Sequence, residues 1–264
     1  MGINWHLGTM GFSYKDWRGA FYPEELPPIR YLSYYSRFFN AVEIDSSFYG
    51  APAPDTIIRW KTLTPESFRF CLKTPREVTH ELHLQGARAA DTMYTFLERV
   101  RLLEGKLGVV LLQFSPRFTS AGMDNLAHFL QQLPQDLRYA VEFRHKSWHT
   151  PITTARLAEL GVCWATTEYP RIPAHFNLTA RHVYIRWIGR HGQYDNHDHE
   201  QADKTKSLQA WKKQLNEILS PDHTVFGFFN NDYAGFAPGT CNKFMALLGL
   251  KTRSFFRPRQ GRLF

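Results

Sequence analysis

Eight short apolar or alternating segments constrain the fold of this 264-residue chain more than any other feature. Most of them are separated by stretches in which apolar residues recur with helical spacing, so strands and helices alternate along the chain. This alternation predicts a parallel sheet, because parallel neighbours need a crossover connection between them. The predicted strands begin near His6, Ala41, Phe68, Leu107, Arg138, Val162, His182 and Thr224.

Helices are predicted between these strands from the same pattern. They cover residues 30–38, 54–63, 87–103, 122–133, 153–160, 203–219 and 240–248. Eight strand units in a chain of this length are typical of a closed, parallel, eight-stranded (β/α)8 barrel of the TIM type. We therefore predict one α/β barrel domain over residues 1–250. An open doubly wound sheet is the alternative, although "GTMG" after the first strand lacks the G-x-G-x-x-G pattern.

Polar side chains recur at alternate positions toward the carboxyl ends of these strands. Period two places them on one face of each strand and apolar residues such as Val42 and Ile44 on the other. In a barrel the polar face points inward, and the carboxyl-terminal mouth is where barrel enzymes keep their chemistry. Structural ion pairs that neutralise one another are the alternative. The polar set comprises Glu43, Asp45, Lys73, Gln113, Glu142, Arg144, Arg186 and Asn230.

Three of these residues are candidate catalytic groups. Glu43 and Glu142 follow the second and fifth strands, so we expect them to flank a ligand as acid and base or to share a divalent cation, Mg²⁺ or Mn²⁺. Lys73 would form a Schiff base if burial lowered its pKa, but neighbouring carboxylates favour the ammonium, so we assign it an electrostatic role. The guanidinium groups of Arg144 and Arg186 suit a phosphate or a carboxylate.

A set of ordered motifs runs from about residue 6 to residue 250. It includes "LGTMGFSYKDWRGAFYP", "AVEIDSSFYGAP", "VVLLQFSPRF", "YAVEFRHKSW", "YIRWIGR" and "GFFNNDYAGFAPGTCNKF". Together these motifs resemble the YecE-like proteins, a family of unknown function. The resemblance implies a TIM-type barrel and no settled activity. It also adds Tyr49, His80 and Asn231 to the predicted ligand-binding residues, whereas Asp45 and Ile188 depart from the family pattern, which has Asn and His there.

The charge balance favours an anionic partner. Lys and Arg number 32 against 24 Asp and Glu, for a formal net charge of +8. Such a basic chain suits nucleic acid or a phosphorylated ligand. Together with the polar mouth, this predicts a nucleic-acid-associated phosphoester hydrolase or a damage-binding protein. A small-molecule enzyme acting on a sugar or sugar phosphate and a non-catalytic binding adaptor are the alternatives.

Other features indicate a cytoplasmic protein. No run approaches the roughly 20 apolar residues of a membrane span. The start of the chain also lacks the basic and apolar regions of a signal peptide. Cys71, Cys163 and Cys241 form no C-x-x-C arrangement, which favours reduced buried thiols over a disulfide framework or a cysteine metal site.

Residues 251–264 form a basic tail that ends in "RPRQGRLF". Gln260, Leu263 and Phe264 fit the pattern Q-x-x-L-F. This pattern is similar to the short peptide by which bacterial replication and repair proteins bind the polymerase sliding clamp. The tail therefore predicts the clamp as a partner, with docking of Leu263 and Phe264 on the barrel's own surface as the alternative.

Overall fold

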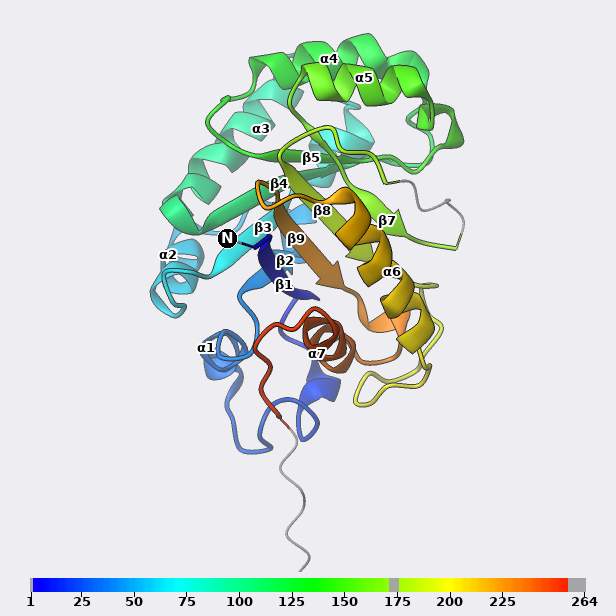
Figure 1. The fold of residues 1–264 in the computed structure, drawn as a ribbon. Coiled ribbons are helices and arrows are strands. Elements are labelled where there is room, and N and C mark those ends of the chain that lie inside the picture. Colours follow the sequence, from blue (N-terminus) through cyan, green and yellow to red (C-terminus); the bar gives the residue numbers. More distant parts are fainter. Residues whose placement is uncertain (1, 171–175, 256–264) are drawn as a thin grey trace, which may run out of the picture.

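All strands in the described part of the chain belong to one parallel sheet that curls into a barrel (Figure 1). The computed structural model describes residues 2–170 and 176–255. The strand order is β6-β5-β4-β3-β2-β1-β9-β8-β7. The strands are β1 (Asn4–Met10), β2 (Ala41–Ile44), β3 (Arg69–Lys73), β4 (Leu107–Gln113), β5 (Tyr139–Glu142), β6 (Cys163–Trp164), β7 (Thr166–Glu168), β8 (His182–Trp187) and β9 (Thr224–Phe229).

Strands β6 and β7 are two parts of one extended segment. β6 pairs with β5, β7 pairs with β8, and only Ala165 separates the two parts. Next to this division the Thr179 hydroxyl accepts a hydrogen bond from the Trp164 amide and donates one to the Val162 carbonyl. These two backbone groups thus bond to a side chain instead of to the backbone of a neighbouring strand. The change of partner nearly closes the sheet. The barrel is thus confirmed, whereas the predicted count of eight strands is not exact because the sixth segment is divided.

Helices cover the outside of the barrel (Figure 1). Within the described ranges they are α1 (Tyr31–Tyr35), α2 (Pro54–Thr62), α3 (Gly86–Val100), α4 (Met123–Gln132), α5 (Pro151–Glu159), α6 (Thr205–Ile218) and α7 (Ala237–Leu247). Each predicted helix is present. The first one ends early, because the Arg37 and Phe38 amides bond three residues back rather than four. The last one begins earlier than predicted, with Pro238 in its first turn.

Two apolar clusters lie on the two faces of the sheet. The outer cluster contains Val42 and Ile44 and packs against the helices, as period two predicted. The inner cluster, which includes Met10, Cys71 and Tyr184, fills the barrel below its mouth. The three cysteines are buried and free, which agrees with the predicted thiols.

Two further predictions from the sequence concern membrane spans and the C-terminal tail. No helix in the described part of the chain is long and apolar enough to cross a membrane. Gln260, Leu263 and Phe264 lie outside the described residues, so the sliding-clamp peptide stays a sequence-based prediction.

Candidate functional site

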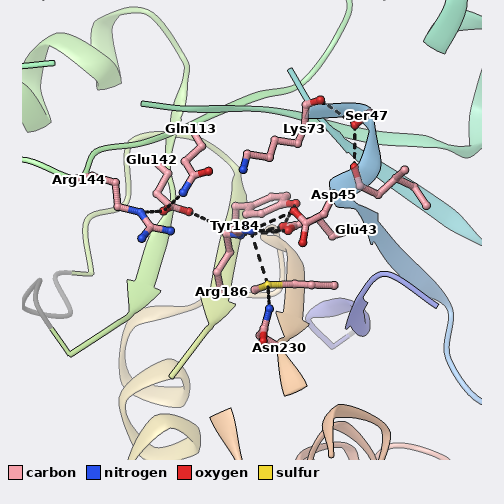
Figure 2. A network of polar contacts seen from close by, with 12 residues as sticks. Glu43, Asp45, Ser47, Lys73, Gln113, Glu142, Arg144, Tyr184, Arg186 and Asn230 are labelled. Carbon is pink, nitrogen blue, oxygen red and sulfur yellow. Dashed lines mark hydrogen bonds and ion pairs between the residues drawn. The ribbon is translucent and has the colours of Figure 1, made fainter. Parts of the chain in front are cut away.

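Arg186 lies at the centre of a buried polar cluster at the carboxyl ends of the strands (Figure 2). Its Nε donates to Glu43 Oε2 at 2.9 Å and its Nη2 donates to Glu43 Oε1 at 2.6 Å. Its Nη1 donates to Glu142 Oε2 at 2.5 Å. The three side chains are 4%, 0% and 1% exposed, in the order Arg186, Glu43, Glu142. The planar guanidinium therefore bridges two carboxylates from opposite sides of the barrel in a fixed geometry.

Tyr184 is a member of this cluster that the sequence analysis missed. It precedes Arg186 by two positions on β8, so both side chains point into the barrel. The Tyr184 hydroxyl donates to Glu43 Oε2 at 2.7 Å. The same period of two that placed Arg186 on the inner face would have found it.

Glu142 is held on its other side by two more donors. Arg144 Nε and Gln113 Nε2, the latter at 3.1 Å, both donate to Glu142 Oε1. Burial by itself would raise the pKa of Glu142, but Arg144 and Arg186 lower it to about 2. Glu142 is thus an anion at neutral pH. Arg144 also lies over the Tyr169 ring, 4.8 Å from its centroid.

Glu43 has the opposite electrostatic setting. Burial raises its pKa, Arg186 acts against burial and Asp45 adds to the rise, so that the pKa is about 7. Asp45 is 37% exposed, and its Oδ1 accepts from Arg186 Nη2 at 3.4 Å. Glu43 and Glu142 share the Arg186 guanidinium but differ in pKa. The reason is that Asp45 lies beside Glu43, whereas Arg144 lies beside Glu142. Such a difference is how proteins separate proton donors from permanent anions.

Lys73 brings an unpaired ammonium to the mouth. Ser47 Oγ lies 2.7 Å from the Lys73 and Ile44 carbonyl oxygens and ties the loop after β2 to the end of β3. This contact sets the Phe48 ring 3.8 Å from Lys73 Nζ. Figure 2 shows the ammonium pointing into the cluster, and it makes no hydrogen bond or ion pair with any residue that the structure describes.

The pKa of Lys73 departs from the expectation that its neighbours would favour the ammonium. Burial and Arg186 lower it to about 8, although Asp45, Glu142 and Glu43 act in the opposite direction. The carboxylates have less effect than expected because arginines already neutralise Glu43 and Glu142.

The remaining predicted residues lie around this cluster in different ways. Asn230 Nδ2 is 3.6 Å from Met10 Sδ at its edge (Figure 2). The His80 ring contacts Phe48, and burial followed by the Lys73 charge lowers its pKa to about 4, so His80 is neutral at pH 7. Tyr49 is 80% exposed and its ring contacts Phe48.

Asn231, another predicted ligand-binding residue, has a structural role. It is buried, and its Oδ1 accepts from the Trp17 indole and the Ala237 amide, both at 3.1 Å. The side chain thus joins the loop after β1 to the start of α7. The structure does not bring this oxygen into the cluster.

Comparison with known proteins agrees with this architecture. A family model described as "Protein of unknown function DUF72" matches residues 6–262. The chain belongs to the DUF72 family. This confirms the resemblance to YecE-like proteins, since the UPF0759 protein YecE of Escherichia coli K12 is 29% identical over 209 residues, covering 70% of this chain and 73% of YecE. The UPF0759 protein YunF of Bacillus subtilis 168 is 27% identical and covers 98% of this chain and 99% of YunF.

Solved structures of DUF72 proteins have the same fold. A DUF72 protein from Thermotoga maritima MSB8 is 28% identical, with a TM-score of 0.77 over 93% of this chain and 99% of that chain. One from Enterococcus faecalis V583 is 23% identical, with a TM-score of 0.73 over 94% of this chain and 99% of that chain. The second likeness supports the fold alone.

Glu43 and Glu142 of this DUF72 chain do not fit the divalent cation site considered from the sequence. All four of their carboxylate oxygens accept hydrogen bonds from arginine side chains. Within residues 2–170 and 176–255, no three His, Cys, Asp or Glu side chains are arranged to hold a metal ion. The expectation of a shared Mg²⁺ or Mn²⁺ is therefore corrected: Arg186 occupies the space between the two carboxylates.

Thr167 is a second residue that the sequence analysis missed. It lies opposite Arg186 in the β7–β8 register, and alternation with Cys163 and Ala165 places it on the inner face. Thr167 is 6% exposed, and its hydroxyl has no hydrogen-bond partner in the described part of the chain. A buried hydroxyl normally has one, so Thr167 is an unsatisfied polar group beside Arg186 on the inner face of the barrel.

Proposed function

We propose that the barrel mouth of this DUF72 protein binds a small anionic molecule of the sugar-phosphate class, with Lys73 and Arg144 contacting its phosphate or carboxylate group. The observation that carries this proposal is the unpaired Lys73 ammonium beside Arg186. A partly buried cation normally has a counterion, and Lys73 Nζ forms no ion pair with any residue that the structure describes. An incoming anion would supply it.

Arg144 adds donors to the same region. Its Nε is used by Glu142, while its Nη1 and Nη2 have no acceptor among the residues described. The carboxylates of Glu43 and Glu142 are neutralised by arginines and so do not repel an anion as strongly as isolated carboxylates would. Lys73 and Arg144 are the donors that we expect an anionic ligand to contact.

We favour a small molecule over nucleic acid because the cluster is recessed inside the barrel. The cluster of Arg186, Glu43 and Glu142 is almost fully buried. A small molecule with one phosphate group can enter such a recess more readily than a polymer backbone can. The phosphoester hydrolase considered from the sequence also lacks a fitting metal site among the described residues. Asp45 is suited to proton transfer on a small substrate, since its carboxylate is partly exposed at the mouth.

Binding of sn-glycerol 3-phosphate tests this proposal. Isothermal titration calorimetry should detect binding by the wild type, and neutral glycerol should not bind. Lys73→Met keeps the length of the side chain and removes its charge, so we expect at least tenfold weaker binding, or about 1.4 kcal/mol.

The matched control is Lys15→Met, which removes an exposed charge in the loop after β1. It should bind as the wild type does. Equal affinity of the wild type and Lys73→Met would reject the proposed site. Salt-sensitive binding of single-stranded DNA that is lost in Lys73→Met would favour the nucleic-acid interpretation instead.

A further inference from the structure

We propose that Lys73 is a nucleophile that forms a Schiff base with the carbonyl carbon of an anionic aldehyde or ketone at the barrel mouth. This inference rests on the proposed anion site and names the substrate class for it: Arg144 keeps the anionic group, and the carbonyl carbon of the same molecule lies at Lys73. It replaces the electrostatic role that the sequence suggested for Lys73.

The surroundings of the Lys73 nitrogen differ from those of another buried lysine. Lys106 Nζ donates to the Lys61 and Thr64 carbonyl oxygens, each at 2.6 Å, and lies 3.7 Å from Glu66 Oε2. Those acceptors hold its protons and leave no lone pair for attack. Lys73 Nζ has no such acceptor within the described ranges, and its side chain is partly exposed at the mouth, where a substrate can reach it.

Burial and Arg186 shift Lys73 toward the neutral amine that attack requires, and they do so against the nearby carboxylates. Arg186 approaches from β8, Glu43 from β2, Asp45 from the turn after β2, Glu142 from β5, and His80 from the helical turn after β3. Burial followed by Arg186 lowers the pKa of Lys73 from its usual 10.5 to about 8. At pH 7 this shift raises the neutral fraction about 300-fold. Desolvation and a neighbouring cation are the two means by which proteins activate a lysine.

Phe48 stabilises the protonated imine that forms when Lys73 attacks the carbonyl carbon. Its ring faces Lys73 Nζ at 3.8 Å, and the negative face of an aromatic ring attracts a cation. A protonated imine carries its positive charge on that nitrogen. The ring therefore holds the nitrogen in place before and after the bond forms.

The reaction balances with groups that the cluster holds. The Lys73 lone pair attacks the carbonyl carbon, and the carbonyl electron pair moves to the oxygen. Asp45, the partly exposed carboxylate whose charge acts on Lys73, carries one proton from the nitrogen to that oxygen to give a carbinolamine. It then carries the second nitrogen proton to the hydroxyl, which departs as water. Amine and carbonyl thus give imine and water, with no oxidant or reductant, while Arg144 holds the substrate's anionic group.

Reductive trapping tests this step on the full chain. The protein is incubated at pH 7 with glyceraldehyde 3-phosphate and sodium cyanoborohydride, and modified lysines are mapped by peptide mass spectrometry. We expect a reduced adduct on Lys73 that forms at least tenfold faster than on Lys106 or on exposed lysines such as Lys15. The rate at Lys73 should rise with a midpoint near pH 8, its pKa in the fold.

Two controls make the result decisive. Lys73→Arg keeps the charge and cannot form an imine, so its rapid adduct should disappear. If that variant does not fold, the peptide map of the wild type still identifies the reactive lysine. Labelling of Lys73 at rates no faster than those of exposed lysines would overturn the proposal.

A second aldehyde separates this proposal from the proposed function. Rapid labelling of Lys73 at equal rates by glyceraldehyde 3-phosphate and neutral glyceraldehyde would support the nucleophile and reject the anion site. Lys73-dependent binding of sn-glycerol 3-phosphate without rapid labelling of Lys73 would support the anion site and reject the nucleophile.

Discussion

At the scale of single residues, Arg186 organises the mouth. One guanidinium holds Glu43 by two nitrogens and Glu142 by the third, and the 4% exposure of Arg186 leaves little water to replace either partner. Breaking a buried pair is costly because the remaining charge keeps its desolvation penalty without compensation. The cluster is therefore both a part of the fold and a support for Lys73.

Glu142→Gln tests this dependence. The substitution keeps the shape of the side chain but leaves Arg144 and Arg186 without their shared anion. We expect the free energy of unfolding to fall by about 3 kcal/mol, measured by urea denaturation. The control is Glu66→Gln, which removes an exposed carboxylate 3.7 Å from Lys106 and should change stability by less than about 0.5 kcal/mol. Equal stability of both variants and the wild type would show that the cluster contributes no net stability.

At the scale of elements, the sequence predicts the alternation of strands and helices well, because periods of two and 3.6 are local properties. It also predicts that Glu43, Lys73, Glu142 and Arg186 converge, since parallel strands end at one mouth. It does not predict which partners pair there. Whether Glu142 faces a metal or Arg186 depends on side-chain positions across the barrel, and the division at Ala165 depends on a hydroxyl 15 residues away from Trp164 in sequence.

Thr179→Val tests the role of that hydroxyl. The change keeps the β-branched shape but removes the acceptor for the Trp164 amide and the donor to Val162. We expect a loss of about 1–3 kcal/mol in unfolding free energy and faster hydrogen exchange at the Trp164 amide. Thr154→Val, which alters an exposed helix hydroxyl, is the control. Unchanged protection of the Trp164 amide would mean that another group caps the end of β6.

At the scale of the whole molecule, the two ends of the barrel respond to pH differently. At the mouth, the pKa of Glu43 is raised from 4.5 to about 7. Between about pH 4.5 and 7 the folded protein therefore keeps a proton on Glu43 that the unfolded chain has lost. The free energy of unfolding falls as the pH rises through that range. At the opposite end, His6 on β1 and His182 on β8 are buried beside the first residues of the sheet. Burial lowers the pKa of each histidine to about 4.

The sign for these histidines is opposite to that for Glu43. In the unfolded chain these histidines become protonated below about pH 6.5, whereas in the folded protein they stay neutral until about pH 4. Their contribution to stability is therefore complete above pH 6.5 and is lost as the pH falls. His182→Gln isolates one of them, because its Nε2 lies 2.9 Å from the Tyr139 carbonyl and an amide can also donate there. Between pH 6.5 and 4, unfolding free energy should fall by up to about 3 kcal/mol more in the wild type than in His182→Gln. Urea denaturation at a series of pH values measures this difference, with the exposed His128→Gln as a control that should follow the wild type. Parallel curves for the wild type and His182→Gln would show that His182 takes up its proton equally in the folded and unfolded states.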